Sequence, residues 1–105
     1  MTDIVTVSIA CGSGAEAQAI ARALVEERLA ACVQSHAVTS TYRWQGAIET
    51  APEVMLTAKT RFDKLPALEA RVRDLHSYAV PEIIAVSVVW AHEPYTTRLN
   101  GTLDK

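Results

Sequence analysis

The chain has 105 residues, of which 50% are hydrophobic and 21% charged, and its net charge is −2 at pH 7. This length and composition fit one globular domain over residues 1–105 and exclude an intrinsically disordered chain. No basic block is available to follow a phosphate backbone, so we predict that nucleic acid is not a partner.

The start of the chain carries no targeting signal that we recognise. Its first 20 residues include Asp3 and no Lys or Arg, whereas a signal peptide begins with positive charge. No apolar run approaches the roughly 18 residues of a transmembrane helix, so we expect no membrane partner. We therefore predict a cytoplasmic protein in which Cys11 and Cys32 are reduced thiols.

Two hydrophobic periods alternate along the first half of the chain. Residues 4–11 alternate apolar and polar side chains with the period of a strand, and Gly12-Ser13-Gly14 interrupts them. From residue 15 to about residue 31 the apolar positions recur with the helical period of 3.6. Period two then returns and continues to a turn at Gln45-Gly46.

Residues 38–60 predict an unusually long β-hairpin. If pairing runs from Cys32 to Thr60, each arm holds about 13 residues, against about 3–10 in most strands. The overhang carries Tyr42 and Trp44, and the rest of so short a chain is too small to cover them. We infer that another copy of the chain covers them.

The second half of the chain predicts two more helices and a strand. Asp63 can cap a helix whose apolar stripe is Leu65, Leu68, Val72 and Leu75. After an irregular connector at residues 76–81, residues 83–90 are almost continuously apolar, which predicts a strand covered on both faces. Glu93-Pro94 begins a short final helix.

The predicted order is β-α-β-β-α-β with a short C-terminal helix added. This is the α+β, ferredoxin-like split βαβ arrangement. Right-handed crossovers give an antiparallel sheet of order 4-1-3-2, with both main helices on one face. The last helix is then the only predicted cover for the other face, which is a second reason to expect an oligomer.

This topology places a group of polar residues beside the end of the first strand. Cys11 ends that strand, and His76, Tyr78 and Glu82 arrive beside it after the second helix. Cys, His and a carboxylate suit a soft or borderline metal ion, whereas the nearby start of the first helix suits an anion. A structural alternative stays open for Cys11 as a small buried residue and for His76 as a partner of helix C-terminal carbonyls.

The other polar residues give weaker signals. Lys59 is a charged residue late in an otherwise apolar strand and is a candidate ligand contact. We expect His36 and His92 on the surface. A disulfide between Cys11 and Cys32 is excluded because a strand of about eight residues, roughly 25 Å, separates them. No Ser/His/Asp set converges and no carboxylate pair has a required spacing, so we predict a protein that is not an enzyme.

Several segments together resemble the CutA family of divalent-cation tolerance proteins. They follow the family's order over most of the chain, in the stretches LVEERLAACV (24–33), TSTYRWQGAIE (39–49), EVMLTAKT (53–60) and LHSYAVPEIIA (75–85), and around Tyr95. The resemblance implies a tight homotrimer of ferredoxin-like subunits, similar in architecture to PII-like signalling trimers. It also implies a role in tolerance of copper and other divalent cations.

The resemblance also assigns candidate site residues. The family's recurring polar and aromatic positions correspond to Trp44, Glu49, Lys59, His76, Tyr78 and Glu82. Cys11 corresponds to a position at which some members have a cysteine linked to copper binding. We therefore expect a ligand site in the cleft between subunits, with Cys11 and His76 as metal ligands. One departure is Ser77, where the family usually has proline.

Two functions follow from these observations. The first is a cytosolic, homotrimeric, non-catalytic protein that needs no cofactor and binds copper or another divalent cation. The alternative is a PII-like sensor that binds a small anionic metabolite between subunits, for which Lys59 and the start of the first helix are the supporting features.

Overall fold

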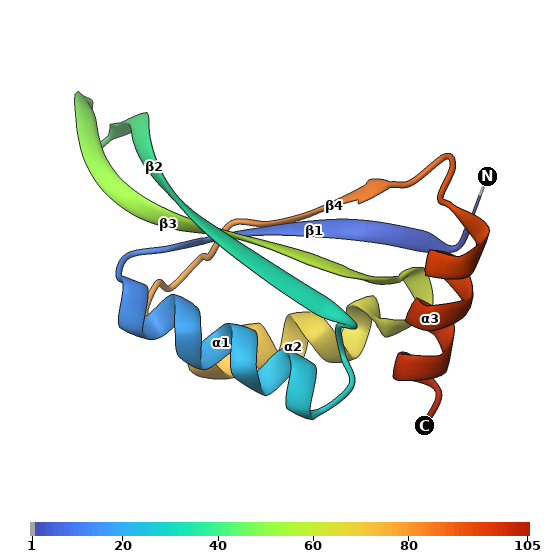
Figure 1. The fold of residues 1–105 in the computed structure, drawn as a ribbon. Coiled ribbons are helices and arrows are strands. Elements are labelled where there is room, and N and C mark those ends of the chain that lie inside the picture. Colours follow the sequence, from blue (N-terminus) through green and yellow to red (C-terminus); the bar gives the residue numbers. More distant parts are fainter. Residues whose placement is uncertain (1) are drawn as a thin grey trace.

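The computed structural model describes residues 2–105 as a four-stranded antiparallel sheet with two helices below it and a third at one end (Figure 1). In chain order the elements are β1 (Ile4–Cys11), α1 (Gly14–Glu26), β2 (Cys32–Trp44), β3 (Ala47–Arg61), the 3-10 turn η1 (Phe62–Lys64), α2 (Leu65–Leu75), β4 (Ile83–Ser87) and α3 (Glu93–Leu103). The sheet order β2-β3-β1-β4 is the predicted order 4-1-3-2 read from the other edge, which confirms the predicted α+β topology.

The two faces of the sheet differ because side chains alternate along β1. Val5, Val7, Ile9 and Cys11 face α1 and α2 and are buried in one apolar core. The helices contribute apolar side chains at helical spacing, which are Ala17, Ile20, Leu24, Leu68 and Val72. Each large aliphatic side chain buried in this way contributes about 1.5–3 kcal/mol relative to an exposed position. The main core therefore lies between the sheet and the two helices.

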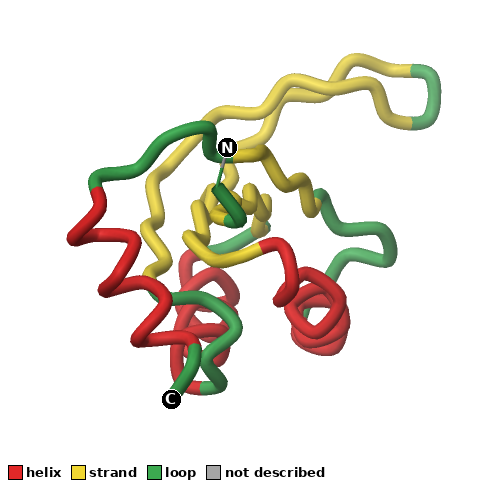
Figure 2. Tube along the Cα trace, turned by 90° about the vertical axis from the view of Figure 1, so that its right-hand side faces the viewer, coloured by secondary structure: helices red, strands yellow, loops and turns green. Residues whose placement is uncertain are grey.

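The long hairpin is present as predicted. β2 and β3 pair without interruption from Cys32 opposite Lys59 to Trp44 opposite Ala47. Gln45 and Gly46 form the turn, both with positive φ, at 50° and 83°, which matches the twist of a two-residue hairpin. The tip projects away from the helices in both views (Figure 1, Figure 2).

The first half of β3 extends beyond β1. β1 pairs with β3 only over residues 54–61, starting from Cys11 opposite Val54. Residues 47–53 therefore pair with β2 alone. Pro52 lies in this part, where its missing N–H interrupts no second ladder.

Two predicted boundaries are wrong. α1 ends at Glu26, not near residue 31, because Arg28 adopts the left-handed conformation with φ 57°. The segment after it is fastened to β3: Ala31 N–H donates to the carbonyl of Lys59 at 2.9 Å, and Thr60 Oγ1 donates to that of Leu29 at 2.7 Å. These contacts come from about 30 residues away and override the local helical period.

The prediction for the last strand also needs correction. β4 ends at Ser87 and lies at an edge of the sheet, and four of its five residues are exposed. The apolar run at residues 83–90 is therefore not covered on both faces by the chain itself. None of the helices in residues 2–105 has the length and apolar character needed to cross a membrane.

The C-terminal helix packs against one end of the sheet. Leu99 and Leu103 of α3 form a second small core with Ile4, on the face opposite α1 and α2. Arg61, at the end of β3, donates to both carboxylate oxygens of Asp104 at 2.7 and 2.9 Å and to Asp63 at 3.0 Å. α3 is thus held by apolar contact on one side and by a charged pair on the other.

We predict that the Arg61 contacts make the free energy of unfolding depend on pH in the acidic range. Hydrogen bonds from Arg61 lower the pKa of Asp63 and of Asp104. A carboxylate with a lowered folded pKa adds stability above its unfolded pKa of about 3.9 and loses it as pH falls through the folded value. Arg61→Met should therefore lose less stability than the wild type between about pH 5 and pH 2, measured by urea unfolding at each pH.

The control variant is Arg22→Met, since Arg22 pairs with Glu26 on an exposed helix surface where solvent screens the interaction. Its acid dependence should follow the wild type. An Arg61→Met curve parallel to the wild-type curve would contradict the prediction.

Candidate functional site

Three side chains with different ligand atoms meet at the end of β1. Cys11 Sγ, a carboxylate oxygen of Glu16 and an imidazole nitrogen of His76 all lie within 4.8 Å of one another. Cys11 is the last residue of β1, Glu16 lies in the first turn of α1, and His76 directly follows α2. The structure thus brings Cys11 and His76 together, as the topology predicted, and adds Glu16 to them. We call these three residues the Cys11 cluster.

The local sequence at the start of α1 positions Glu16. Ser13 is the N-cap, with an extended backbone, and its Oγ accepts the N–H of Glu16 at 3.2 Å. Ser13 and Glu16 have the Ser-x-x-Glu spacing of a capping box, in which the Glu side chain usually returns to the N-cap. Here it turns to His76 instead, with Oε1 3.3 Å from Nδ1. Glu16 was not predicted as a site residue, because the Ser-x-x-Glu spacing marks a helix start but does not predict a contact with His76.

Hydrogen bonds determine which imidazole nitrogen carries the proton. His76 Nε2 lies 2.7 Å from the carbonyl oxygen of Ala10, which can only accept, so Nε2 is protonated. Nδ1 accepts the backbone N–H of Tyr78 at 3.1 Å and is therefore the nitrogen without a proton. The imidazole is neutral in this arrangement.

Glu16 consequently faces another acceptor. Its Oε1 is buried and has no hydrogen-bond partner among residues 2–105. The approach of 3.3 Å to Nδ1 meets the distance of an ion pair, but it is no hydrogen bond while both atoms are acceptors. A buried acceptor without a donor is destabilising, so this position favours a positive charge between Glu16 and His76.

Tyr78 covers the outer side of this group. Its ring lies 4.7 Å from that of His76, and its hydroxyl donates to Glu53 Oε2 at 2.8 Å. The ring lies so close to Gly12 that a Cβ there would approach Tyr78 Oη to 2.9 Å. Gly12 is therefore required for this close approach, and Glu53 is a second residue that the sequence analysis missed.

Negative charge and burial shift the pKa values of the nearby groups. Burial raises the pKa of the Cys11 thiol to about 11, and the charges of Glu16 and Glu53 add to the effect. The hydrogen bond to Glu53 raises the pKa of Tyr78 to about 12, with burial as the second cause. At neutral pH the corner therefore holds a protonated thiol between carboxylates, which disfavours an anion and favours a cation.

One chain does not bring Lys59, Trp44 and Glu49 to this corner. Lys59 pairs with Thr6 near the far end of β1, and its Nζ donates to Gln34 Oε1 at 2.7 Å. Trp44 and Glu49 lie near the tip of the hairpin, and both are exposed. Glu82 is exposed just before β4, and because Ile83 pairs with Ile9 it lies at the Cys11 end of β1. A shared cleft for these residues requires a second chain and stays a prediction.

The two cysteines and the other histidines have simple environments. Cys11 and Cys32 are both free, as the topology predicted. Cys32 is half-buried at the start of β2. His36 and His92 are exposed, which confirms the prediction that they are surface residues.

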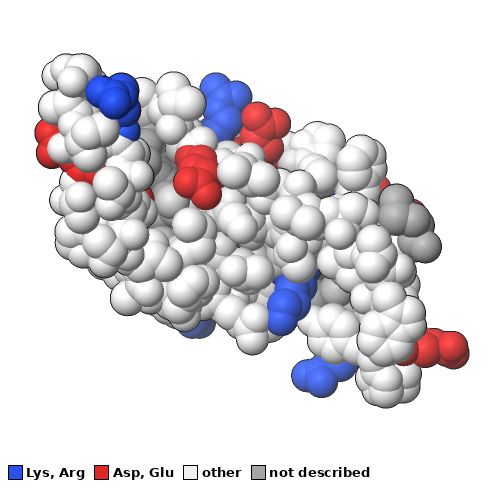
Figure 3. All heavy atoms as spheres, turned by 90° about the horizontal axis from the view of Figure 1, so that it is seen from above, with Lys and Arg blue, Asp and Glu red and all other residues white. Residues whose placement is uncertain are grey.

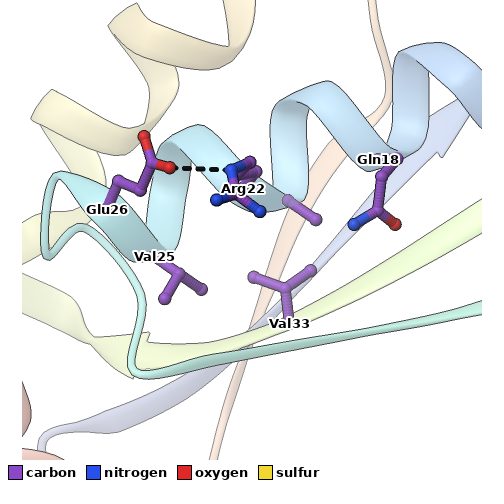
Figure 4. A pocket seen from close by; sticks show the side chains of 6 residues that line it. Gln18, Arg22, Val25, Glu26 and Val33 are labelled. Atoms are coloured by element: carbon purple, nitrogen blue, oxygen red, sulfur yellow. Dashed lines mark ion pairs between the residues drawn. The ribbon is translucent and has the colours of Figure 1, made fainter.

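Two surface grooves differ in how they relate to this corner. One of about 320 Å³ lies between α1 and β2 and is lined by Gln18, Val25 and Val33, with the Arg22–Glu26 ion pair on its helix side (Figure 4). It contains no residue of the Cys11 cluster. The other, of about 540 Å³, lies between the last turns of α2 and the residues that follow it, and Tyr78 is part of its lining. Tyr78 thus lines the second groove while its ring packs against His76.

Comparisons with known proteins agree with the geometry. The family model for the CutA1 divalent ion tolerance protein matches residues 5–101. The chain is 48% identical over 80 residues to the divalent-cation tolerance protein CutA of Thermus thermophilus, covering 75% of this chain and 78% of that protein. It is 44% identical over 88 residues to mouse protein CutA, covering 83% of this chain but only 50% of that relative.

Solved structures of similar proteins have the same fold. Superposition on CutA from Xylella fastidiosa gives a TM-score of 0.95 at 41% identity, with 98% of this chain and 100% of that chain covered. An Archaeoglobus fulgidus structure, described as a periplasmic divalent cation tolerance protein, gives 0.93 at 32% identity, with 95% and 98% covered.

We predict that Glu53→Gln lowers the pKa of Tyr78 from about 12 towards the ordinary value of about 10. The reason is that the carboxylate opposes formation of a phenolate beside it, and a neutral amide opposes it less. The titration can be followed by NMR of carbon-13-labelled tyrosine. Glu49→Gln, on the same strand, is the control and should leave the Tyr78 titration unchanged. Equal Tyr78 titrations in wild type and Glu53→Gln would contradict the assignment.

Proposed function

The chain belongs to the CutA1 divalent ion tolerance family, and from this premise we propose that it is a homotrimeric, non-catalytic protein that binds copper or another divalent cation at the Cys11 cluster. One observation carries the proposal. The buried Oε1 of Glu16 has no hydrogen-bond donor among residues 2–105, yet it lies beside a thiol and an imidazole lone pair. A bound cation would satisfy this carboxylate oxygen, with the thiol and the imidazole as its other ligands.

The ligand types suit a borderline or soft ion. Sulfur, imidazole nitrogen and a carboxylate are the ligands of zinc sites, and imidazole with sulfur also suits copper. The hydrogen bond from His76 Nε2 to the carbonyl of Ala10 has the form usual for a ligating histidine, whose second N–H is held by a carbonyl or carboxylate. Three protein ligands are fewer than the four of a closed structural zinc site, which favours reversible binding.

The open face of the sheet supports self-association. Tyr42, Trp44, Ile84 and Val86 lie on the face opposite α1 and α2, and each is more than two-fifths exposed. Few charged side chains interrupt this side of the molecule (Figure 3). These side chains lie near the two opposite edges of the sheet, on β4 and on the projecting part of β2. Large apolar side chains exposed on one face favour an interface there. The family resemblance implies three copies, and the protruding hairpin supplies an arm that can reach a neighbour.

We further propose the cytoplasm as its compartment because both cysteines are free, as expected where thiols are kept reduced. The alternative of an anionic metabolite has less support. Its main cation, Lys59, is engaged by Gln34. The start of α1 lies beside Glu16 and Glu53, whose charges oppose an anion.

The cation site can be tested by calorimetric titration with Cu²⁺ and with Zn²⁺. We expect one high-affinity ion per chain in the wild type. The double variant Cys11→Ser, His76→Gln should bind at least tenfold more weakly because it lacks two of three ligands.

The matched control is Cys32→Ser, His36→Gln, which changes the same residue types outside the cluster and should bind like the wild type. Wild-type affinity and stoichiometry in the Cys11, His76 variant would remove the proposal. If the small anionic metabolites of a ligand screen raise the melting temperature with chelator present, the alternative function is favoured.

The oligomer can be tested by sedimentation at micromolar concentration, where we expect three times the chain mass. Ile84→Asp, Val86→Asp should shift the protein towards the monomer because it places two charges on the open face. Val25→Asp changes an exposed apolar residue of α1 on the helix side and should remain a trimer. A wild-type monomer would contradict the proposal.

A further inference from the structure

The lone pair of His76 Nδ1 already has a partner in this structure. We propose that a cation at Nδ1 must displace the backbone N–H of Tyr78, and that this displacement links the Cys11 cluster to the root of the hairpin through the Tyr78–Glu53 hydrogen bond. The inference rests on the proposed cation site and concerns the structural change that cation binding would cause at the hairpin.

The other imidazole nitrogen is not available to a cation. Nε2 carries its proton towards the carbonyl of Ala10, which lies 2.7 Å away. Ala10 is 3% exposed and is held opposite Met55 within the sheet, so this acceptor is fixed. Binding at Nε2 would leave a buried carbonyl without its donor, which is destabilising. Nδ1 is therefore the nitrogen that can ligate.

Nδ1 cannot serve two partners at once. It has a single lone pair in the plane of the ring, and the N–H of Tyr78 occupies it at 3.1 Å. Glu16 Oε1 lies 3.3 Å from the same nitrogen, so the proposed cation would lie between these two atoms. Occupation by a cation thus requires either the ring or the Tyr78 amide to move.

The amide is the group with freedom to move. The side chain of His76 has no exposed surface, and its own N–H donates to the carbonyl of Val72 at the end of α2 at 2.8 Å. Residues 77–80 are exposed and form neither helix nor strand. Segments with few buried contacts rearrange at low free-energy cost. We therefore expect residues 77–80 to move while the imidazole ring of His76 stays in place.

Movement of Tyr78 should affect the hairpin because this residue makes two further contacts. Its ring packs against the backbone of Gly12, and its hydroxyl donates to Glu53 at 2.8 Å. β1 pairs with β3 only from Val54 onward, so Glu53 is the first residue beyond that ladder and lies opposite Val38. Glu53 thus marks the root of the overhang that carries Tyr42 and Trp44.

The test uses Zn²⁺ with the full chain labelled with nitrogen-15. We expect zinc to shift the Nδ1 resonance of His76 while Nε2 stays protonated. The Tyr78 amide proton should move upfield and lose protection from hydrogen exchange, because its acceptor is taken. A merely structural role for Tyr78 would produce none of these changes.

Tyr78→Phe gives a second readout with a defined sign. It removes the hydroxyl bond to Glu53, which holds the connector in its cation-free position, and keeps the backbone N–H. Zinc should therefore bind about three- to tenfold more tightly, as expected for loss of one hydrogen bond that opposes binding. Tyr95→Phe makes the same chemical change on α3, at the other end of the sheet, and should leave the affinity unchanged.

The outcomes separate the two proposals. If zinc leaves both imidazole nitrogens of His76 unchanged, the cation site and this inference fall together. If zinc shifts Nδ1 but the Tyr78 amide keeps its shift and protection, or if zinc deprotonates Nε2 instead, the site stands and only the coupling is overturned. Unchanged or weaker zinc binding in Tyr78→Phe would overturn the link through Glu53.

Discussion

The pairing of β1 with β3 stops at Cys11 opposite Val54, and the rest of the molecule depends on that stop. β1 has eight residues and β3 has 15, so the register that buries Val7 and Ile9 under the helices leaves the first part of β3 without a second neighbour. The same stop places the last side chain of β1 beside the start of α1 and the end of α2. One hydrogen-bonded register thus creates both the projecting arm and the corner that holds the Cys11 cluster.

The corner is organised by an excess of acceptors over donors. The carbonyl of Ala10 fixes the proton on His76 Nε2, the amide of Tyr78 takes the remaining lone pair, and Glu16 Oε1 is left facing both without a donor. Burial and the two nearby carboxylates raise the pKa of Cys11 and so keep it protonated at neutral pH. Such an arrangement costs stability in the absence of a positive charge, and the proposed cation would restore that stability. The same electrostatics oppose the anion that a helix start by itself would attract.

Much of the fold could be predicted because its determinants are local. Period two and the Gln45-Gly46 turn gave the hairpin, and the order of elements with right-handed crossovers gave the sheet and the closeness of Cys11 to His76. The end of α1 could not be predicted in this way because Lys59 and Thr60 of β3 set it. The predicted cover of β4 was wrong because an apolar run shows that a strand is hydrophobic but does not show which element, if any, of the same chain covers it. Glu16 and Glu53 were missed because hydrophobic periodicity does not fix the direction of a polar side chain.

The energies at the corner are of a size that a bound ion can overcome. The Tyr78 amide and hydroxyl each make one hydrogen bond, and each such bond adds about 0.5–1.5 kcal/mol net, more where a charged group takes part. A cation with a dissociation constant of about 1 μM has a binding free energy of about −8 kcal/mol, which is larger than the free energy of both hydrogen bonds together. A ligand shifts a two-state equilibrium only by its difference in affinity for the two states. Here the difference arises at a single atom, because Nδ1 is either the acceptor of the Tyr78 N–H or a ligand. In the proposed coupling, occupancy of the cluster and the position of Glu53 at the root of the hairpin would therefore change together.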